Sequence, residues 1–169
     1  MFILFLIAVS LQVIFFIVFL VALFRKESQH EADNQALSLI VCAHDEEQNL
    51  RELIPLLLSQ QHECFEVIIV NDRSNDGTYD FLLAETKKEA RLKMVHIEKK
   101  PDHVNAKKYA LTLGIKAAQF DWVVLTYADC RPHSTQWLNS LNAKMSDQTD
   151  VVLGYSPYHK SRSEEHTSE

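Results

Sequence analysis

The sequence lacks a glycine-rich phosphate loop. It has only three glycines, Gly77, Gly114 and Gly154, and neither G-x-G-x-x-G nor G-x-x-x-x-G-K-[ST] occurs in it. Those loops hold phosphates in dinucleotide-binding and P-loop proteins. Their absence therefore disfavours a Rossmann dehydrogenase and a P-loop NTPase.

Clustered positive charge and metal-type cysteine spacing are also missing. The 169 residues carry a formal net charge of -6 with no block of like charge, whereas a nucleic-acid-binding domain needs a clustered basic face. We therefore expect no nucleic-acid partner. Cys42, Cys64 and Cys130 lie far apart. We expect them to be reduced thiols that behave as small hydrophobic side chains of a cytosolic domain, without a disulfide or a zinc site.

The N-terminal segment contains the one long apolar run. Phe2 to Phe24 has no charged residue, and about 20 apolar residues suffice to cross a bilayer. A cleaved signal peptide is the alternative, but it needs a basic start, a shorter apolar core and a small-residue cleavage site, and none is present. Since Arg25 and Lys26 follow the run, the positive-inside bias predicts a membrane anchor over residues 1–26, with the rest of the chain on the cytoplasmic side.

Polar segments follow the anchor and end the chain. Residues 27–36 predict a linker, so that the folded domain begins near Leu37. The last eight residues, Arg162 to Glu169, have no periodicity and resemble the translation of a widely used sequencing adapter. We expect residues 161–169 to be a non-native tail and the natural protein to continue past this point; an ordinary disordered polar tail is the alternative.

Between these segments, short apolar runs alternate with helical patterns. Strands are predicted over residues 37–42, 65–70, 92–97, 122–126 and 151–153, and helices over 46–60, 79–90, 105–118 and from Pro132 to about Met145. This order predicts an α/β fold with a mainly parallel sheet and right-handed crossovers. Ligands of such sheets bind beyond the carboxyl ends of the strands, so the residues that follow each strand are the candidate site residues.

Carboxylates follow three of the predicted strands. Asp45 and Glu46 come after the first strand, Asp72 and Asp76 after the second, and Asp129 after the fourth. Any one of them is explained as well by a helix cap or a turn. Three sets on one rim repel one another unless a cation or a hydroxyl-rich ligand is bound. We therefore predict a ligand site at this rim, and Mg²⁺ or Mn²⁺ suits carboxylate and phosphate oxygens.

Four stretches resemble motifs of the family 2 glycosyltransferases, which are inverting enzymes of the GT-A fold. They are IVCAHDEEQNL, EVIIVNDRSNDGT, AKKYALTLGIKAA and DWVVLTYADCRP, which together run from about Leu37 to Pro132. Three positions depart from the family's usual motifs: Asp45 stands in place of Asn, Ala106 in place of Gly, and Tyr127 in place of the first acid of an Asp-x-Asp pair.

The resemblance implies roles for the matching residues. His44 and Glu46 would line the nucleotide pocket, Asp72 would contact the base, and Lys107 would lie near the nucleotide or the diphosphate. A solvated surface position is the alternative for this lysine.

The last motif would supply the metal ligand. Asp129 matches the second acid of the pair, which implies that it binds the Mg²⁺ or Mn²⁺ that bridges the diphosphate of a nucleoside-diphosphate sugar. Tyr127 stands where an acid usually helps to bind the ribose or the metal shell. Three explanations remain open: the phenol hydrogen-bonds the ribose, the metal is held less tightly, or the residue is a sequence error, since Tyr and Asp codons differ at one base.

The resemblance implies a membrane-anchored glycosyltransferase that transfers a sugar from a nucleotide sugar to a hydroxyl of a glycan or lipid-linked acceptor, with inversion. Residues 37–160 would be its donor-binding half. The family's general base lies further along than this chain extends, so we expect little transfer from the 169 residues alone. A non-catalytic, membrane-tethered module of the same fold is the alternative that Tyr127 favours. A nucleotidyltransferase ranks last, because the first loop is acidic instead of glycine-rich and basic.

Overall fold

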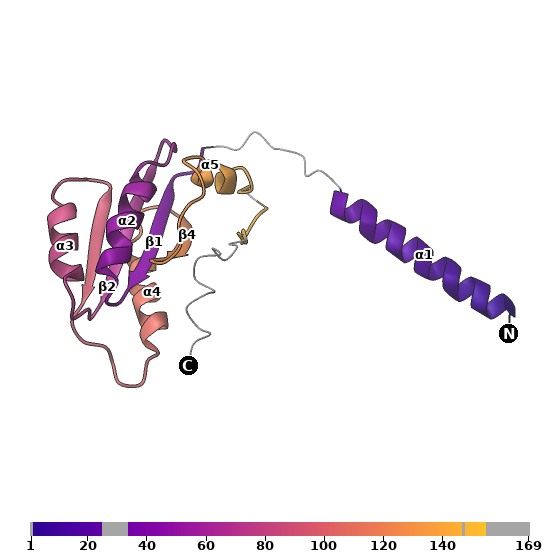
Figure 1. Ribbon diagram of the computed structural model, residues 1–169, viewed down its shortest axis with the longest axis horizontal. Helices are drawn as coiled ribbons and strands as arrows, with labels where there is room; N and C mark the ends of the chain where they lie inside the picture. Colours follow the sequence, from indigo (N-terminus) through magenta and orange to yellow (C-terminus); the bar gives the residue numbers. More distant parts are fainter. Residues whose placement is uncertain (1, 25–33, 147, 155–169) are drawn as a thin grey trace, which may run out of the picture. The chain divides into compact units, whose positions relative to one another are not determined.

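A computed structural model describes residues 2–24, 34–146 and 148–154 (Figure 1). It divides into two compact units, Met1–His30 and Glu31–Glu169. The first contains helix α1 (Phe2–Phe24), in which Phe2–Val21 has a mean hydropathy of 3.0. This helix is long and apolar enough to cross a membrane, although a signal sequence would have the same properties. The predicted tail over 161–169 and most of the predicted linker lie outside the described residues.

The second unit is built on a parallel sheet. Its four strands, β1 (Leu37–Ala43), β2 (Phe65–Asp72), β3 (Leu92–Ile97) and β4 (Trp122–Tyr127), lie in the order β3-β2-β1-β4. The central strand β2 is buried along its whole length. Apart from Glu66, its residues 65–70 are apolar, which is the pattern of a strand covered on both faces. The predicted α/β fold with a parallel sheet is confirmed.

Helices cover both faces of this sheet (Figure 1). They are α2 (Glu47–Leu58), α3 (Thr78–Glu85), α4 (Ala106–Ala117) and α5 (Trp137–Asn142). One core joins α2, α3 and α5 to the sheet through Leu53, Leu82 and Leu138. On the opposite face, Ala110 of α4 packs against residues of β1 and β2 such as Ile40 and Val70. The helices thus provide the apolar cover that a parallel sheet requires.

The strand order places a topological switch point between β1 and β4. From β1 the chain moves outward through β2 to β3, and after α4 it returns to the other side of β1 as β4. The crossovers on the two sides of this point run in opposite directions, which leaves a crevice at the carboxyl ends of β1 and β4 where ligands bind in such sheets. The fold therefore brings the segment after β1 and the segment after β4 to the expected ligand position.

The strand predicted over residues 151–153 is wrong. The segment has no regular structure, and Val151 and Leu153 are 72% and 90% exposed. An apolar run becomes a strand only where a neighbouring strand pairs with it, and no described strand pairs with this segment.

The helix predicted from Pro132 is wrong in its first turns, because α5 begins at Trp137. Gln60, in the loop after α2, binds both sides of the start of α5. Its side-chain amide nitrogen donates to the carbonyl of Ser134 at 2.9 Å, and its Oε1 accepts from the backbone N–H of Leu138 at 3.1 Å. These contacts take the backbone groups that a helix would pair with each other. The helix predicted over 79–90 also ends early, at Glu85.

All three cysteines are free, in agreement with the prediction of reduced thiols. Cys64 is exposed, whereas Cys42 and Cys130 are half-buried.

Candidate functional site

The six candidate residues lie at the carboxyl ends of β1, β2 and β4 and in the first turn of α4. His44 and Glu46 follow β1, Asp72 ends β2, Lys107 lies in α4, Tyr127 ends β4, and Asp129 follows it. In the sheet register Cys42 of β1 lies opposite Tyr127 of β4. The predicted rim is therefore one edge of the sheet, as expected for parallel strands.

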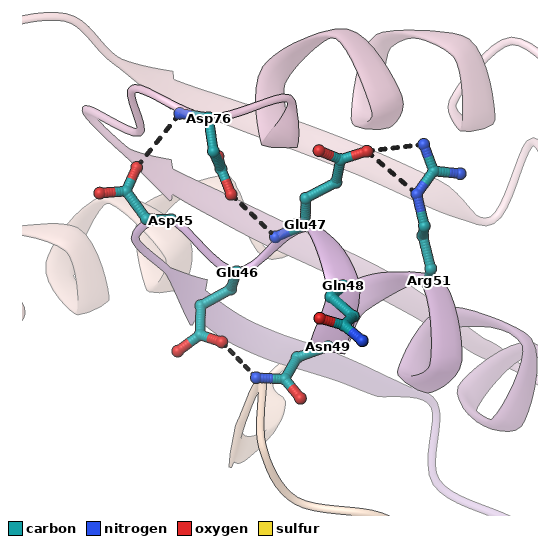
Figure 2. Close-up of a pocket in the computed structure, with 7 residues that line it drawn as sticks. All are labelled: Asp45, Glu46, Glu47, Gln48, Asn49, Arg51 and Asp76. Atoms are coloured by element: carbon teal, nitrogen blue, oxygen red, sulfur yellow. Dashed lines mark hydrogen bonds and ion pairs between the residues drawn. The ribbon is translucent and has the colours of Figure 1, made fainter.

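The segments after β1 and β2 are tied together by two aspartates. Asp45 Oδ1 accepts from the backbone N–H groups of Asn75 and Asp76, at 2.6 and 3.3 Å, and Asp76 Oδ2 accepts from the N–H of Glu47 at 3.2 Å (Figure 2). Burial raises the pKa of Asp76, but hydrogen bonds from Thr78 and from the Glu47 backbone outweigh this and lower it. For Asp45 and Asp76 the cap-and-turn explanation holds, so these two acids do not depend on a cation.

A hollow of about 520 Å³ lies beside the start of α2. Figure 2 shows its lining residues: Asp45, Glu46, Glu47, Gln48, Asn49, Arg51 and Asp76. Within it, Glu47 Oε1 pairs with Arg51 at 2.7 Å, and Glu46 Oε2 accepts from Asn49 Nδ2 at 2.5 Å. Of the six candidate residues named above, only Glu46 lines this hollow. A second hollow of about 720 Å³, along β4, contains Tyr127. The structure thus spreads the candidates over neighbouring surfaces of the rim.

The acid predicted to contact the base already has a cationic partner. The residue is 7% exposed, and Arg73 donates to both oxygens of Asp72, from Nε at 2.7 Å and from the terminal nitrogen at 3.2 Å. This hydrogen bonding raises the pKa of Arg73. His44 Nδ1 lies 2.5 Å from the backbone carbonyl oxygen of Asp72. Two candidates are therefore in contact, and Arg73 is a partner that sequence reasoning missed.

Lys107 and Tyr127 form a second pair. Lys107 Nζ donates to the Tyr127 hydroxyl at 3.0 Å and lies 4.4 Å from the centre of its ring. The hydrogen bond raises the pKa of Lys107. Beneath this pair, burial and the charge of Asp72 raise the pKa of the Cys42 thiol, while the charge of Lys107 lowers it. Because the charges of Asp72 and Lys107 both affect the pKa of Cys42, the His44–Asp72 pair and the Lys107–Tyr127 pair both lie near this residue of β1.

Asp129 is an exposed residue of the turn that follows β4, and Ala128 before it is buried. The backbone N–H of Cys130 closes this turn on the carbonyl of Tyr127 at 3.1 Å. Within residues 2–24, 34–146 and 148–154, no group of three or more His, Cys, Asp and Glu side chains is placed to hold a metal ion. A single carboxylate does not make a self-contained metal site, but it fits a hard cation that takes its other ligands from a diphosphate and from water.

Arg131 is a second residue that sequence reasoning missed. It follows this turn and hydrogen-bonds to both the turn and α2. One feature of the sequence could have pointed to it: Arg131 is the only Lys or Arg between Lys116 and Lys144.

Similarity to known proteins agrees with this geometry. The family model described as "Glycosyl transferase family 2" matches residues 38–168. An uncharacterized glycosyltransferase of Haemophilus influenzae is 28% identical over 69% of this chain and 40% of its own length. A poly-beta-1,6-N-acetyl-D-glucosamine synthase of Staphylococcus epidermidis is 29% identical over 61% of this chain and 24% of its own length.

Among solved structures, the fold is similar to that of a mannosyltransferase from Pyrobaculum calidifontis in complex with GDP-mannose and Mn²⁺. The TM-score is 0.61 at 22% identity, over 74% of this chain and 37% of that one. The chain thus spans less than half the length of these relatives. The matched model and the parallel sheet agree with the motifs in the sequence, and the chain belongs to the family 2 glycosyltransferases.

Proposed function

We propose that this chain is the donor-binding part of a membrane-anchored glycosyltransferase, which binds a nucleoside-diphosphate sugar together with Mg²⁺ or Mn²⁺. The observation that carries the proposal is the position of Lys107, Tyr127 and Asp129 at the switch point between β1 and β4. One cation and one carboxylate there match the mixed charge of a metal-bound diphosphate. The structure of the Pyrobaculum enzyme in complex with GDP-mannose and Mn²⁺ supports this ligand class.

Each candidate has a role that its contacts support. Lys107, at the start of α4, supplies positive charge to the diphosphate, and the Tyr127 hydroxyl, which orients the lysine, is available to the ribose. Asp72 and His44, held to each other and to Arg73, form the side of the site that faces the base. Glu46 lines the nucleotide pocket beside them. The divalent ion, with Asp129 as its protein ligand, would stabilise negative charge on the leaving diphosphate.

Transfer completes the proposed reaction. A hydroxyl of a glycan or lipid-linked acceptor attacks the anomeric carbon on the face opposite the diphosphate, the bond to the diphosphate breaks, and the configuration inverts. The general base that removes the hydroxyl proton is not assigned to any residue of this chain. We expect the 169 residues to bind the donor without efficient transfer.

We also propose that α1 anchors this domain to a lipid bilayer from the cytoplasmic side. The support is the uncharged apolar length of α1 and the Arg25-Lys26 pair that follows it. Vesicles that contain the protein can be washed with alkaline carbonate and then treated with protease. The proposal requires that the protein stay in the membrane and that protease on the cytoplasmic side remove the domain; release by carbonate, or protection of the domain, would contradict it.

Calorimetry on the detergent-solubilised chain tests the donor site. UDP and GDP are titrated with MnCl₂ and again with EDTA, and we expect at least one nucleotide to bind more tightly with Mn²⁺. Asp129→Asn should lower the Mn²⁺-dependent affinity at least about tenfold, which corresponds to about 1.4 kcal/mol. Asp121→Asn is the matched control, because Asp121 is an exposed acid just before the opposite end of β4. Absence of binding of either nucleotide at millimolar concentration would overturn the proposal in favour of a non-catalytic module.

A further inference from the structure

We propose that Arg131 is a positioning residue of the donor site, which holds the turn that carries Asp129 and links it through Asn49 to Glu46. The inference rests on the function proposed above, because it gives Asp129 and Glu46 their roles at the donor. It adds two residues, Arg131 and Asn49, that bind no donor atom themselves.

The guanidinium of Arg131 fixes the backbone on both sides of Asp129. One terminal nitrogen donates to the carbonyl of Ala128 at 2.7 Å and to that of Cys130 at 3.1 Å. These are the residues immediately before and after Asp129. Ala128 is buried in the core, Cys130 is half-buried and Asp129 between them is exposed, so packing holds the start of the turn. The two charged hydrogen bonds from Arg131 hold the carbonyls on either side of Asp129. The direction in which Asp129 leaves the turn therefore depends on Arg131.

The other terminal nitrogen reaches α2. It donates to Asn49 Oδ1 at 3.0 Å, and the amide nitrogen of the same side chain donates to Glu46 Oε2 at 2.5 Å. The amide orientation follows from charge, since its oxygen faces the cation and its nitrogen faces the carboxylate. Asn49 thus transmits the position of the Asp129 turn, after β4, to Glu46, after β1. The two segments that flank the switch point are held at a fixed separation.

Only an arginine can make this set of contacts. A guanidinium presents several N–H donors in a planar fork, whereas a lysine ammonium is a point charge on a flexible chain. The side chain of Arg131 is 28% exposed, so most of it is covered by neighbouring groups. Its remaining contact, with Glu52 Oε2 at 3.0 Å, is at the surface, where the glutamate side chain is 65% exposed. An exposed ion pair contributes little to stability, so the contacts of Arg131 that hold the structure are those with the two carbonyls and with Asn49.

Two substitutions separate these contacts. Arg131→Lys keeps the charge and loses the fork. Asn49→Ala keeps the contacts to the Ala128 and Cys130 carbonyls and cuts the link to Glu46, and alanine is the better helix former at this position of α2. Arg91→Lys is the control for the chemical change itself, because Arg91 pairs with Glu89 and lies over Phe65, at the end of the sheet opposite the rim.

The experiment uses the whole chain in detergent and two readouts. Hydrogen exchange of the backbone amides of residues 128–131 reports on the turn, and titration of Mn²⁺ in the presence of UDP or GDP, followed by its EPR signal, reports on the metal at Asp129. Partners that orient a metal ligand typically change metal affinity about 10–100-fold. We expect Arg131→Lys to speed exchange at the turn and to weaken Mn²⁺ binding at least about tenfold, with a smaller loss for Asn49→Ala and no change for Arg91→Lys.

The double variant Arg131→Lys/Asn49→Ala should bind Mn²⁺ no more weakly than Arg131→Lys, because the two residues act in one chain of contacts. Wild-type affinity for Mn²⁺ in Arg131→Lys, or additive losses in the double variant, would overturn the inference. If the wild-type chain itself binds no nucleotide with Mn²⁺, the proposed function fails and takes this role with it. That result is distinct, because it appears before any substitution is made.

Discussion

Gly114 offers the sharpest test of how α4 is held against the sheet. A methyl group added at its Cα would lie 2.6 Å from Ile40 Cγ2 and 2.9 Å from Val70 Cγ2. Carbon atoms in favourable contact are about 3.5–4.0 Å apart, so both contacts are too short by more than half an ångström. Ile40 and Val70 are almost fully buried in β1 and β2, and their branched side chains have no alternative space. The helix itself must move.

The magnitude of the effect follows from two opposing terms. Overpacking of a buried site costs about 1–3 kcal/mol, and two short contacts to rigid neighbours place Gly114→Ala in the upper part of that range. Alanine recovers about 1 kcal/mol of helix propensity relative to glycine. We expect a net loss of about 1–2 kcal/mol in the free energy of unfolding, measured by urea denaturation of the chain in detergent with the fluorescence of its two tryptophans.

Gly77→Ala is the matched control. The three atoms nearest to its added methyl group would all belong to the side chain of Glu47, which can rotate away, and the backbone φ of Gly77 is an ordinary -74°. We expect a change below about 1 kcal/mol, the typical cost of alanine at a helix N-cap. The reasoning is refuted if Gly114→Ala is as stable as wild type or more stable, because α4 would then tolerate a side chain where the structure leaves no room.

Two further predictions concern titrating groups. Burial raises the pKa of Glu66, but hydrogen bonds from Lys93, Ser38 and the backbone of Gln119 outweigh this and hold it below 4.5. The carboxylate therefore stabilises the fold above about pH 4.5, and this contribution is lost as the pH falls through the lowered pKa. Glu66→Gln should cost about 1–3 kcal/mol at pH 7 and progressively less as the pH falls below 4.5, measured by urea denaturation from pH 7 into the acid range; a difference that is constant with pH would contradict this. Tyr127→Phe removes the hydroxyl that accepts from Lys107, so the pKa of Lys107 should fall toward 10.5; NMR titration of methylated lysines measures it, with Tyr79→Phe as the control, and an unchanged pKa would refute the contact.

The strands that pair on both sides could be predicted from sequence, and the segments at the margin of the sheet could not. The run FEVIIV marks β2 because a parallel strand covered on both faces is mainly apolar, and Glu66 is the one charged residue of the run. The run at 151–153 is also apolar but has no regular structure, since pairing with a neighbour is what turns such a run into a strand. The predicted start of α5 was wrong for a related reason. Gln60, far along the chain, supplies the partners that local helix signals cannot reveal.

In the candidate site, too, some features could be predicted from the sequence and others could not. The positions of Asp72 and Asp129 could be predicted because residues that follow parallel strands share one edge of the sheet. The arginines beside them could not be assigned, because the fold sets the side-chain directions of Arg73, which pairs with Asp72, and of Arg131, which donates to the Ala128 carbonyl. Asp45 and Asp76 were indistinguishable from ligand-binding acids until their hydrogen bonds to backbone N–H groups were visible.

The contact between Lys107 and Tyr127 changes what the missing acid implies. An aspartate at position 127 would neutralise Lys107, whereas the phenol leaves the lysine its full charge and raises its pKa. The rim then has one negative charge fewer, which weakens its attraction for a cation and leaves the charge of Lys107 less compensated for a diphosphate. Tyr127→Asp should therefore tighten Mn²⁺ binding and make nucleotide binding more dependent on it. Calorimetry with UDP or GDP, with MnCl₂ and with EDTA, measures both effects. A variant that binds the nucleotide in EDTA as tightly as wild type does would show that the freed charge of Lys107 plays no part in holding the diphosphate.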